Sequence, residues 1–169
     1  IDTLRRDHLG CYGYDRPTSP NIDRLAARSI RYERAYSPAP WTTPSTAALL
    51  SSRRPSELGI RTQKKRLDDE VVLLPEILQA NGYTTGAVLG NRIVGKRWNF
   101  DQGYDVFNEE HSTGHEAVSS GGISDDGIAF IDEHFARRPS FLLLHYFDPH
   151  FNYVEQADHP FYEEVGYEG

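Results

Sequence analysis

Short apolar segments alternate with polar ones along the chain, and their spacing predicts helices and strands in turn. Residues 21–29 ("NIDRLAARS") place Ile22, Leu25 and Ala26 at helical spacing, directly after a proline. Residues 74–83 ("LPEILQANGY") predict another helix, with a proline in its first turn and Gly82 as its C-terminal stop.

Other segments have the pattern of strands. Residues 83–90 ("YTTGAVLG") are rich in Thr, Val and Tyr, and residues 30–37 ("IRYERAYS") alternate as a short strand does. Residues 141–147 ("FLLLHYF") form a nearly continuous apolar run, which is typical of a strand buried on both faces. Ile1 and Asp2 have the pattern of the last step of a strand.

Residues 124–138 ("SDDGIAFIDEHFARR") predict a long helix. Ser124 is its expected N-cap, acidic residues fill its first turn, and arginines fill its last. Ile128, Ile131 and Phe135 are expected on one buried face.

One further helix is predicted to begin at Thr43-Pro44 and to end near Ser52. Residues 53–70 and 90–120 are expected to be irregular, because they are polar or rich in Gly, Asn and Ser. Helices that alternate with apolar strands predict an α/β fold with a mostly parallel sheet, flanked by helices.

Composition narrows the possible functions. The chain has 169 residues, 38% of them hydrophobic and 25% charged, which suits one globular domain. No apolar run approaches the ~20 residues needed to cross a bilayer. The sequence has no aromatic-interleaved basic stripe that would indicate nucleic-acid binding. Because the chain starts at Ile1 and has no methionine, we expect it to be an internal piece of a longer polypeptide.

The charge distribution and the cysteine content say more about which ligands and sites to expect. Residues 1–66 hold 13 Lys and Arg against 6 Asp and Glu, whereas the remainder holds 5 against 19. The locally basic part suits an anionic ligand, and a solvated surface explains it nearly as well. The single cysteine, Cys11, excludes an internal disulfide and a multi-cysteine zinc site.

Candidate chemistry lies where predicted strands end. Asp2 follows the first strand, Thr42 and Thr43 lie at a loop-to-helix junction, and Asp148-Pro149-His150 follows the apolar run. Ligands of such folds gather at the carboxyl ends of strands. Each residue also has a structural interpretation; Thr43 before a proline, for example, is a common helix N-cap. On the residues alone, a nucleophile and a helix cap remain alternatives for the threonine pair.

The ordered blocks along the chain resemble the sulfatase family, within the alkaline-phosphatase-like superfamily of metal-dependent hydrolases. The resemblance runs through residues 1–60, "LLPEILQANGYTTGAVLG", "FDQGYDVF" and "HYFDPHFNY". It implies that residues 1–169 are the N-terminal part of a single catalytic domain, whose later Asp-His segment with further metal ligands lies beyond Gly169.

The resemblance also implies roles for individual residues. Asp2 matches a carboxylate that binds the divalent metal, and Thr42 falls at the nucleophile position, where it is expected to bind that metal too. His150 matches a histidine that contacts the ester group, and it is expected to be catalytic with Thr42. One or two ions of Ca²⁺, Mg²⁺, Mn²⁺ or Zn²⁺ are therefore expected, with a small anionic ester as substrate. We expect Thr43 among the substrate-binding residues.

The sequence departs from the family pattern in two places. The nucleophile position usually holds a cysteine or serine that becomes formylglycine, whereas Thr42 cannot be converted, so no formylglycine is expected. The family's "GKWH" segment corresponds to residues 90–93 ("GNRI"), so that Asn91 and Ile93 replace a lysine and a histidine. Asn91 and Arg92 are the expected substrate contacts there.

Two functions follow from this combination. The first is a sulfatase-family hydrolase that cleaves sulfate or phosphate esters through Thr42, similar to phosphodiesterases of the superfamily that form a covalent phosphothreonine. The second is a non-catalytic relative that binds an anion or a partner. The lost formylglycine residue and cationic side chains keep the second open, whereas the retained hydroxyl favours the first.

Overall fold

The fold was obtained as a computed structural model that describes residues 1–63, 65–114 and 119–150. Its main elements follow in this order: α1 (Pro20–Ala26), α2 (Thr42–Ser51), α3 (Leu74–Ala80), β1 (Thr84–Leu89), β2 (Val106–Asn108), α4 (Ser120–His134) and β3 (Ser140–His145). Short 3-10 turns are η1 (Arg6–His8), η2 (Gly10–Tyr12), η3 (Arg92–Val94) and η4 (Lys96–Trp98).

The strands of the described residues form one parallel sheet in the order β2-β1-β3. β1 pairs with β3 along its whole length, from Thr84 opposite Ser140 to Leu89 opposite His145. All six residues of β1 are buried, as expected for a central strand covered on both faces. Because the strands are parallel, their carboxyl ends meet at one edge of the sheet.

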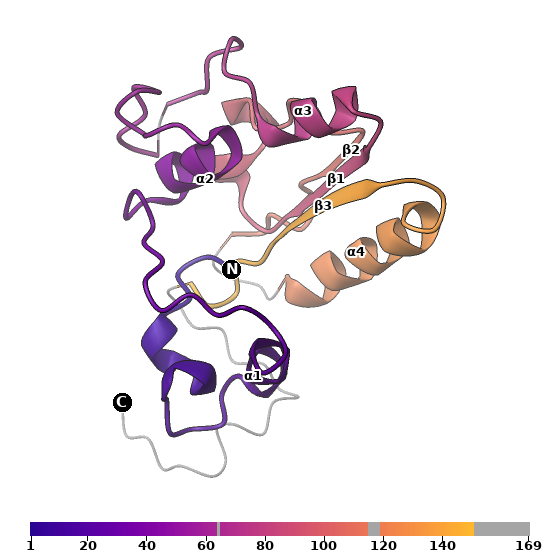
Figure 1. Cartoon of the computed structure of the whole chain (residues 1–169). Coiled ribbons are helices and arrows are strands. Elements are labelled where there is room, and N and C mark those ends of the chain that lie inside the picture. The colour runs from indigo at the N-terminus through magenta and orange to yellow at the C-terminus, as the bar shows by residue number, and fades with distance from the viewer. Residues whose placement is uncertain (64, 115–118, 151–169) are drawn as a thin grey trace.

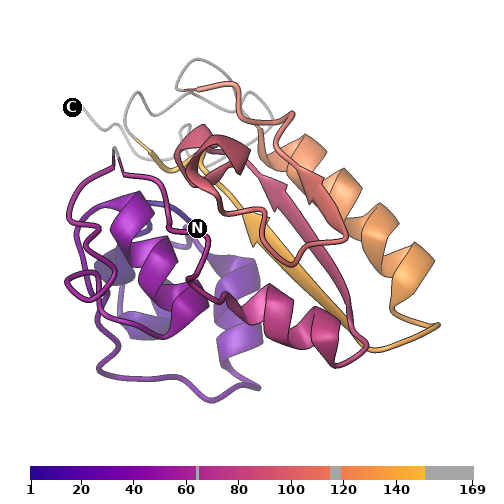
Figure 2. The same ribbon diagram turned by 90° about the horizontal axis from the view of Figure 1, so that it is seen from above.

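Helices cover both faces of this sheet, with α4 on one face and α2 and α3 on the other (Figures 1 and 2). Two glycines allow α4 to approach closely. A Cβ at Gly86 of β1 would lie 2.5 Å from the Phe130 ring, and one at Gly127 of α4 would lie 2.9 Å from Leu144 of β3. The opposite face carries the main hydrophobic cluster, which includes Ala47, Leu50, Leu67, Leu73, Ala87, Leu89 and Phe100.

Residues 3–41, called the N-terminal segment from here on, lie below the sheet in the view of Figure 1 and include α1. Within this segment only Leu9 and Ser19 are buried. Polar contacts hold it instead: Asp23 accepts hydrogen bonds from the backbone of Cys11 at 2.7 Å and from the hydroxyl of Ser19 at 3.1 Å.

The sequence predictions for the fold class and for several elements are confirmed. The helices over 21–29 and 74–83 correspond to α1 and α3, and the strands over 83–90 and 141–147 correspond to β1 and β3. Gly82 has a positive φ of 82°, which suits its role as the stop of α3.

Two predicted strands are wrong. Residues 30–37 form no strand, and their alternating side chains point to solvent: Ile30 is 86% and Tyr36 is 85% exposed. No described strand lies beside them to accept their backbone hydrogen bonds. Ile1 and Asp2 form no strand either, although the Asp2 N–H donates to the Tyr146 carbonyl at 2.9 Å.

The long helix α4 begins earlier than predicted, and it buries another face. It starts at Ser120, so Ser124 lies inside it and donates to the Ser120 carbonyl at 2.8 Å. The buried residues are Ile123, Gly127 and Phe130, whereas the expected face is partly exposed (Ile128 57%, Ile131 40% and Phe135 47%). The small Gly127 marks the contact face, because it admits a side chain from β3.

Three smaller differences concern strands and a helix start. β2 lies in a region predicted to be irregular, and β3 is half-buried along its length rather than buried. α2 begins at Thr42, with Trp41 as its N-cap, so Thr43 is not the cap. Two predicted segments lie partly outside the described residues: the irregular segment at 115–118 and the "HYFDPHFNY" block at 151–153.

Candidate functional site

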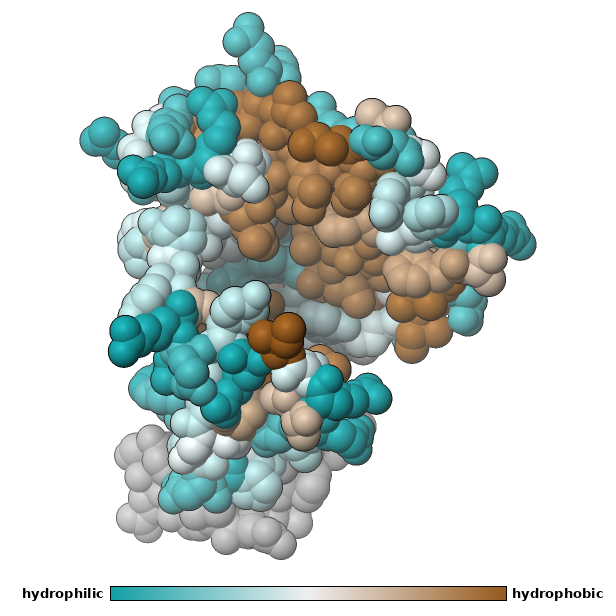
Figure 3. Space-filling view, viewed as in Figure 1, coloured by the Kyte–Doolittle hydropathy of each residue, from teal (hydrophilic) through white to brown (hydrophobic). Residues whose placement is uncertain are grey.

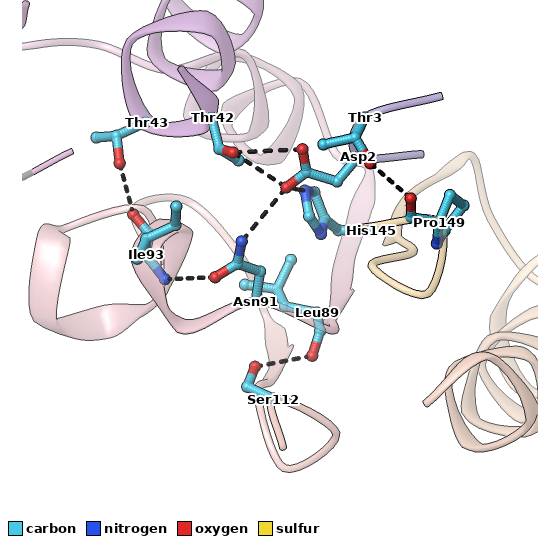
Figure 4. A network of polar contacts seen from close by, with 10 residues as sticks. All are labelled: Asp2, Thr3, Thr42, Thr43, Leu89, Asn91, Ile93, Ser112, His145 and Pro149. Atoms are coloured by element: carbon cyan, nitrogen blue, oxygen red, sulfur yellow. Dashed lines mark hydrogen bonds and ion pairs between the residues drawn. The ribbon is translucent and has the colours of Figure 1, made fainter. Parts of the chain in front are cut away.

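Asp2 is the point at which four separate parts of the chain meet (Figure 4). The hydroxyl of Thr42, the first residue of α2, donates to the Asp2 carboxylate at 3.0 Å from Oδ2 and 3.3 Å from Oδ1. Asn91, just after β1, donates from Nδ2 to Oδ2 at 3.3 Å. The last residue of β3, His145, places Nε2 at 3.7 Å from Oδ2.

Burial governs the protonation of His145. Its side chain is only 12% exposed and that of Asp2 only 9%, so both lie largely out of water. Burial lowers the pKa of His145, and the Asp2 carboxylate partly opposes this shift. The neutral ring with its proton on Nε2 suits the contact with Asp2. It leaves Nδ1, which is buried without a hydrogen-bond partner among the described residues, as an acceptor.

Backbone contacts hold Asp2 against the end of β3. Besides the Asp2 N–H bond to Tyr146, the Thr3 hydroxyl donates to the Pro149 carbonyl at 3.0 Å. Thr3 has a positive φ of 53°, which is uncommon for a β-branched residue. The backbone therefore turns sharply after Asp2, and contacts with the residues after β3 hold it in that conformation.

The segment after β1 is also fixed by hydrogen bonds. Thr43 is fully buried, and its hydroxyl donates to the Ile93 carbonyl at 3.1 Å. Asn91 accepts from the Ile93 N–H at 3.1 Å through Oδ1 while its Nδ2 faces Asp2. Asn91 thus links the β1 end to the site, and Thr43 ties α2 to the same segment.

A cleft of about 700 Å³ opens beside these residues. Figure 3 shows the molecule hollowed between its apolar upper part and the N-terminal segment below. Asp2, Thr42, Asn91, His145 and His150 all line it. The structure therefore brings Asp2, Thr42 and His150 into one cleft, although they lie far apart in the sequence.

Two predicted substrate contacts lie elsewhere. Arg92 is exposed and does not line the cleft, and the buried Thr43 does not line it either. No Lys or Arg of the described residues lines the cleft. Apolar side chains supply much of its wall, including Trp41, Leu49, Ile93, Phe107 and Phe147.

Asp148, in the turn after β3, anchors the start of α4. Its carboxylate accepts hydrogen bonds from the backbone N–H of Ser119 at 2.9 Å and of Ser120 at 2.8 Å, and from both hydroxyls. Burial raises the pKa of Asp148, but these hydrogen bonds outweigh it and hold the pKa below its ordinary value. Asp148 is therefore a structural support that fixes the turn carrying His150.

The side-chain oxygens around Asp2 are of the type that binds a hard divalent cation. The Asp2 carboxylate and the Thr42 hydroxyl are oxygen donors, as Ca²⁺ and Mg²⁺ prefer. Among the described residues, no group of three or more His, Cys, Asp or Glu side chains is placed to hold a metal ion. These two residues supply only part of the ~6 ligands that such a cation takes.

Sequence reasoning missed His145. It lies within the apolar run at 141–147, whose pattern predicts a buried strand and gives no reason to single out one residue. The available signal was its position: a histidine at the end of a parallel strand, five residues before His150.

No helix among the described residues is long and apolar enough to cross a membrane.

The parallel sheet flanked by helices, with a polar site at the carboxyl ends of its strands, places the protein in the α/β class. The chain belongs to the sulfatase family, because the family model described as "Sulfatase" matches residues 1–168.

Curated relatives agree with this family. Human arylsulfatase A is 41% identical over 91 residues, which cover 50% of this chain and 18% of that protein. An N-acetylglucosamine-6-O-sulfatase of Bacteroides thetaiotaomicron is 22% identical over 166 residues, covering 89% of this chain and 30% of that protein. The chain therefore spans about a fifth to a third of the length of these relatives.

Solved structures share the fold. A structure described as in complex with its substrate D-glucosamine-2-N,6-O-disulfate has a TM-score of 0.75 and 23% identity, covering 88% of this chain and 33% of that one. A protein of the alkaline phosphatase superfamily from Vibrio parahaemolyticus has a TM-score of 0.54 and 19% identity, covering 82% of this chain and 38% of that one.

Proposed function

We propose that the protein containing this chain hydrolyses small sulfate or phosphate esters, with Thr42 as the nucleophile. One observation carries the proposal: the Thr42 hydroxyl lies at the start of a ten-residue helix, faces a cleft and donates to a largely buried carboxylate, Asp2. A helix cap needs no such partner, and Thr42 is not the N-cap residue.

The position of Thr42 suits attack on a tetrahedral anion. The N-terminus of α2 carries the positive end of the helix dipole, which favours negative charge at that point. Asp2 orients the hydroxyl through its hydrogen bond. As the Thr42 oxygen bonds to the sulfur or phosphorus, the bond to the ester oxygen would break, and the Thr42 proton would pass to that oxygen, which leaves as the alcohol. Water would then cleave the ester on Thr42, releasing the sulfate or phosphate and restoring the Thr42 hydroxyl.

A divalent cation fits this proposal, with Asp2 and Thr42 as the residues of this chain that would hold it. When bound, it would supply positive charge that lowers the pKa of the hydroxyl and offsets the charge of the ester oxygens. The absence of Lys and Arg from the described cleft wall makes such a charge more important. His150 would contact the bound ester group, since its side chain lines the same cleft.

The experiment that tests this function replaces Thr42 in the full-length protein. Turnover of an aryl sulfate, a phosphate monoester and a phosphodiester is measured for the wild type, Thr42→Ala and Thr42→Ser. We expect Thr42→Ala to lose several orders of magnitude in kcat with unchanged folding, and Thr42→Ser to keep part of the rate.

Thr43→Val is the matched control. It removes the neighbouring hydroxyl, which donates to Ile93, so it should cost about 1 kcal/mol of stability and leave turnover nearly intact. Full activity in Thr42→Ala would refute the nucleophile assignment. A wild-type protein that binds sulfate or phosphate without turnover of any of the three substrates would establish the non-catalytic alternative.

A further inference from the structure

We infer that His145 is a positioning residue that holds one oxygen of the Asp2 carboxylate so that the other faces the cleft. The inference rests on the proposed function of the site and adds a residue to it. It starts from an asymmetry between the two carboxylate oxygens of Asp2.

The oxygen Oδ2 carries nearly all the contacts. It receives Thr42 Oγ1 at 3.0 Å, Asn91 Nδ2 at 3.3 Å and His145 Nε2 at 3.7 Å, from three different parts of the fold. Among the described residues, Oδ1 has only the longer contact to Thr42, at 3.3 Å. Oδ1 is therefore the oxygen that remains for a further ligand in the cleft.

His145 is well placed to keep this asymmetry. It ends β3, and the hydrogen bond from Gly90 N–H to its carbonyl, at 2.9 Å, fixes its backbone next to the end of β1. The side chain is only 12% exposed, so its ring has little freedom to turn away. The 3.7 Å separation between Nε2 and Oδ2 exceeds a direct hydrogen bond, so the ring acts by its position and by the polar N–H that it turns toward Oδ2.

The position matters because a carboxylate can rotate about its last bond. Without His145, Asn91 and Thr42 would be the remaining side chains of the described residues that contact the Asp2 carboxylate, and Thr42 changes its partners when it attacks the ester. Neighbours that orient a ligating or orienting carboxylate typically change activity ~10–100-fold when they are removed. His145 thus acts through Asp2 and makes no contact with the reacting atoms.

The first test is a double-mutant cycle in metal-free protein, with EDTA present. The denaturation midpoint of the full-length protein is measured for Asp2→Asn, His145→Phe and the double variant. His145→Phe keeps a ring of similar size and removes both nitrogens. We expect the shift of the double variant to be smaller than the sum of the single shifts. Additive shifts would overturn the inference, whatever the activity assays show.

The second test separates positioning from packing. In the same protein, His145→Phe should lower kcat at least tenfold and leave KM within twofold. His145→Gln, which restores an N–H donor near the Nε2 position, should recover most of the rate and should remain folded if the phenylalanine variant does not. Equal kcat losses in both variants, or unchanged kcat in both, would overturn the inference.

His111→Phe is the matched control. His111 also contacts an aspartate, with Nε2 2.7 Å from Asp126, but it does not line the cleft. It should lower stability without changing kcat. If Thr42→Ala loses activity and the shifts of the Asp2 and His145 variants are additive, this inference alone is refuted. If Thr42→Ala keeps full activity and the shifts are less than additive, the proposed nucleophile alone is refuted.

Discussion

The sheet with its helices, residues 42–145, and the N-terminal segment, residues 3–41, are stabilised in different ways. β1 is buried along its whole length, and α2, α3 and α4 pack around the sheet. The N-terminal segment buries almost no apolar side chain, and α1 has no buried residue. It depends on hydrogen bonds such as those of Asp23. The site lies at the junction, since Asp2 and Thr42 flank the weaker region.

The geometry of the site does not depend on the N-terminal segment alone. Asp2 is held by contacts to the residues that end or follow β3, and Thr42 belongs to the packed helix α2. Local stability follows buried apolar contacts, so the N-terminal segment should open far more often than the sheet.

The largest effect is expected from truncation in the main hydrophobic cluster. Phe100 is 1% exposed, so Phe100→Ala should cost about 3–5 kcal/mol of unfolding free energy through lost burial and a cavity. Leu25→Ala in α1 is the matched change in the other region. Because Leu25 is 54% exposed, its cost should stay within about 0.5 kcal/mol. Chemical denaturation measures both, and equal costs would remove the contrast.

An intermediate effect is expected from Asp23→Ala. The change leaves the Cys11 N–H and the Ser19 hydroxyl without their carboxylate, at a local cost of about 1.5–3 kcal/mol. Hydrogen exchange should become faster in the N-terminal segment and stay unchanged in β1. The control is Asp101→Ala, outside that segment. Faster exchange throughout the sheet after the Asp23 change would show that the two regions unfold together.

The smallest effect is expected on the pH dependence of stability in acid, through Asp148. The pKa of Asp148 is held below its ordinary value, so its contribution to stability is fully present above the unfolded pKa, near 3.8. It is lost as the pH falls through the lower, folded pKa, because the unfolded state then binds the proton more readily. Asp148→Asn should therefore reduce the fall in stability below pH ~4. Thermal denaturation between pH 2 and 7 checks this, and an unchanged profile would contradict it.

The sequence predicted the central parts of the fold because their signals are local. The buried strand at 84–89 and the helix at 74–80 carry apolar side chains, turn residues and a proline at the expected places. β2 escaped prediction because three residues between polar turns carry no usable periodicity. The alternation at 30–37 misled because a strand also needs a neighbour, which no periodicity reveals.

The site was predictable only in part. The expected strand ends point to Asp2 and His150, a loop-to-helix junction points to Thr42, and the family resemblance points to all three; the structure places them in one cleft, although no strand of the described residues precedes Asp2. The contact between His145 and Asp2 was not predictable, because it depends on how Asp2 docks against the end of β3. The residue that marks the buried face of α4 is Gly127, which has no side chain and which apolar patterning therefore does not count.

Residues 2 and 42 are 40 positions apart in sequence, yet a hydrogen bond of 3.0 Å joins their side chains. The intervening segment is therefore a closed loop. The entropic cost of closing a flexible loop rises only with the logarithm of its length, by about 0.6 kcal/mol for each doubling. Insertions or deletions between Thr3 and Trp41 that spare these two residues should consequently leave the contact between Asp2 and Thr42 in place. The part of the cleft wall that this segment supplies, which includes Ser37, Ala39 and Pro40, can therefore change in length and sequence while the Asp2–Thr42 contact is kept.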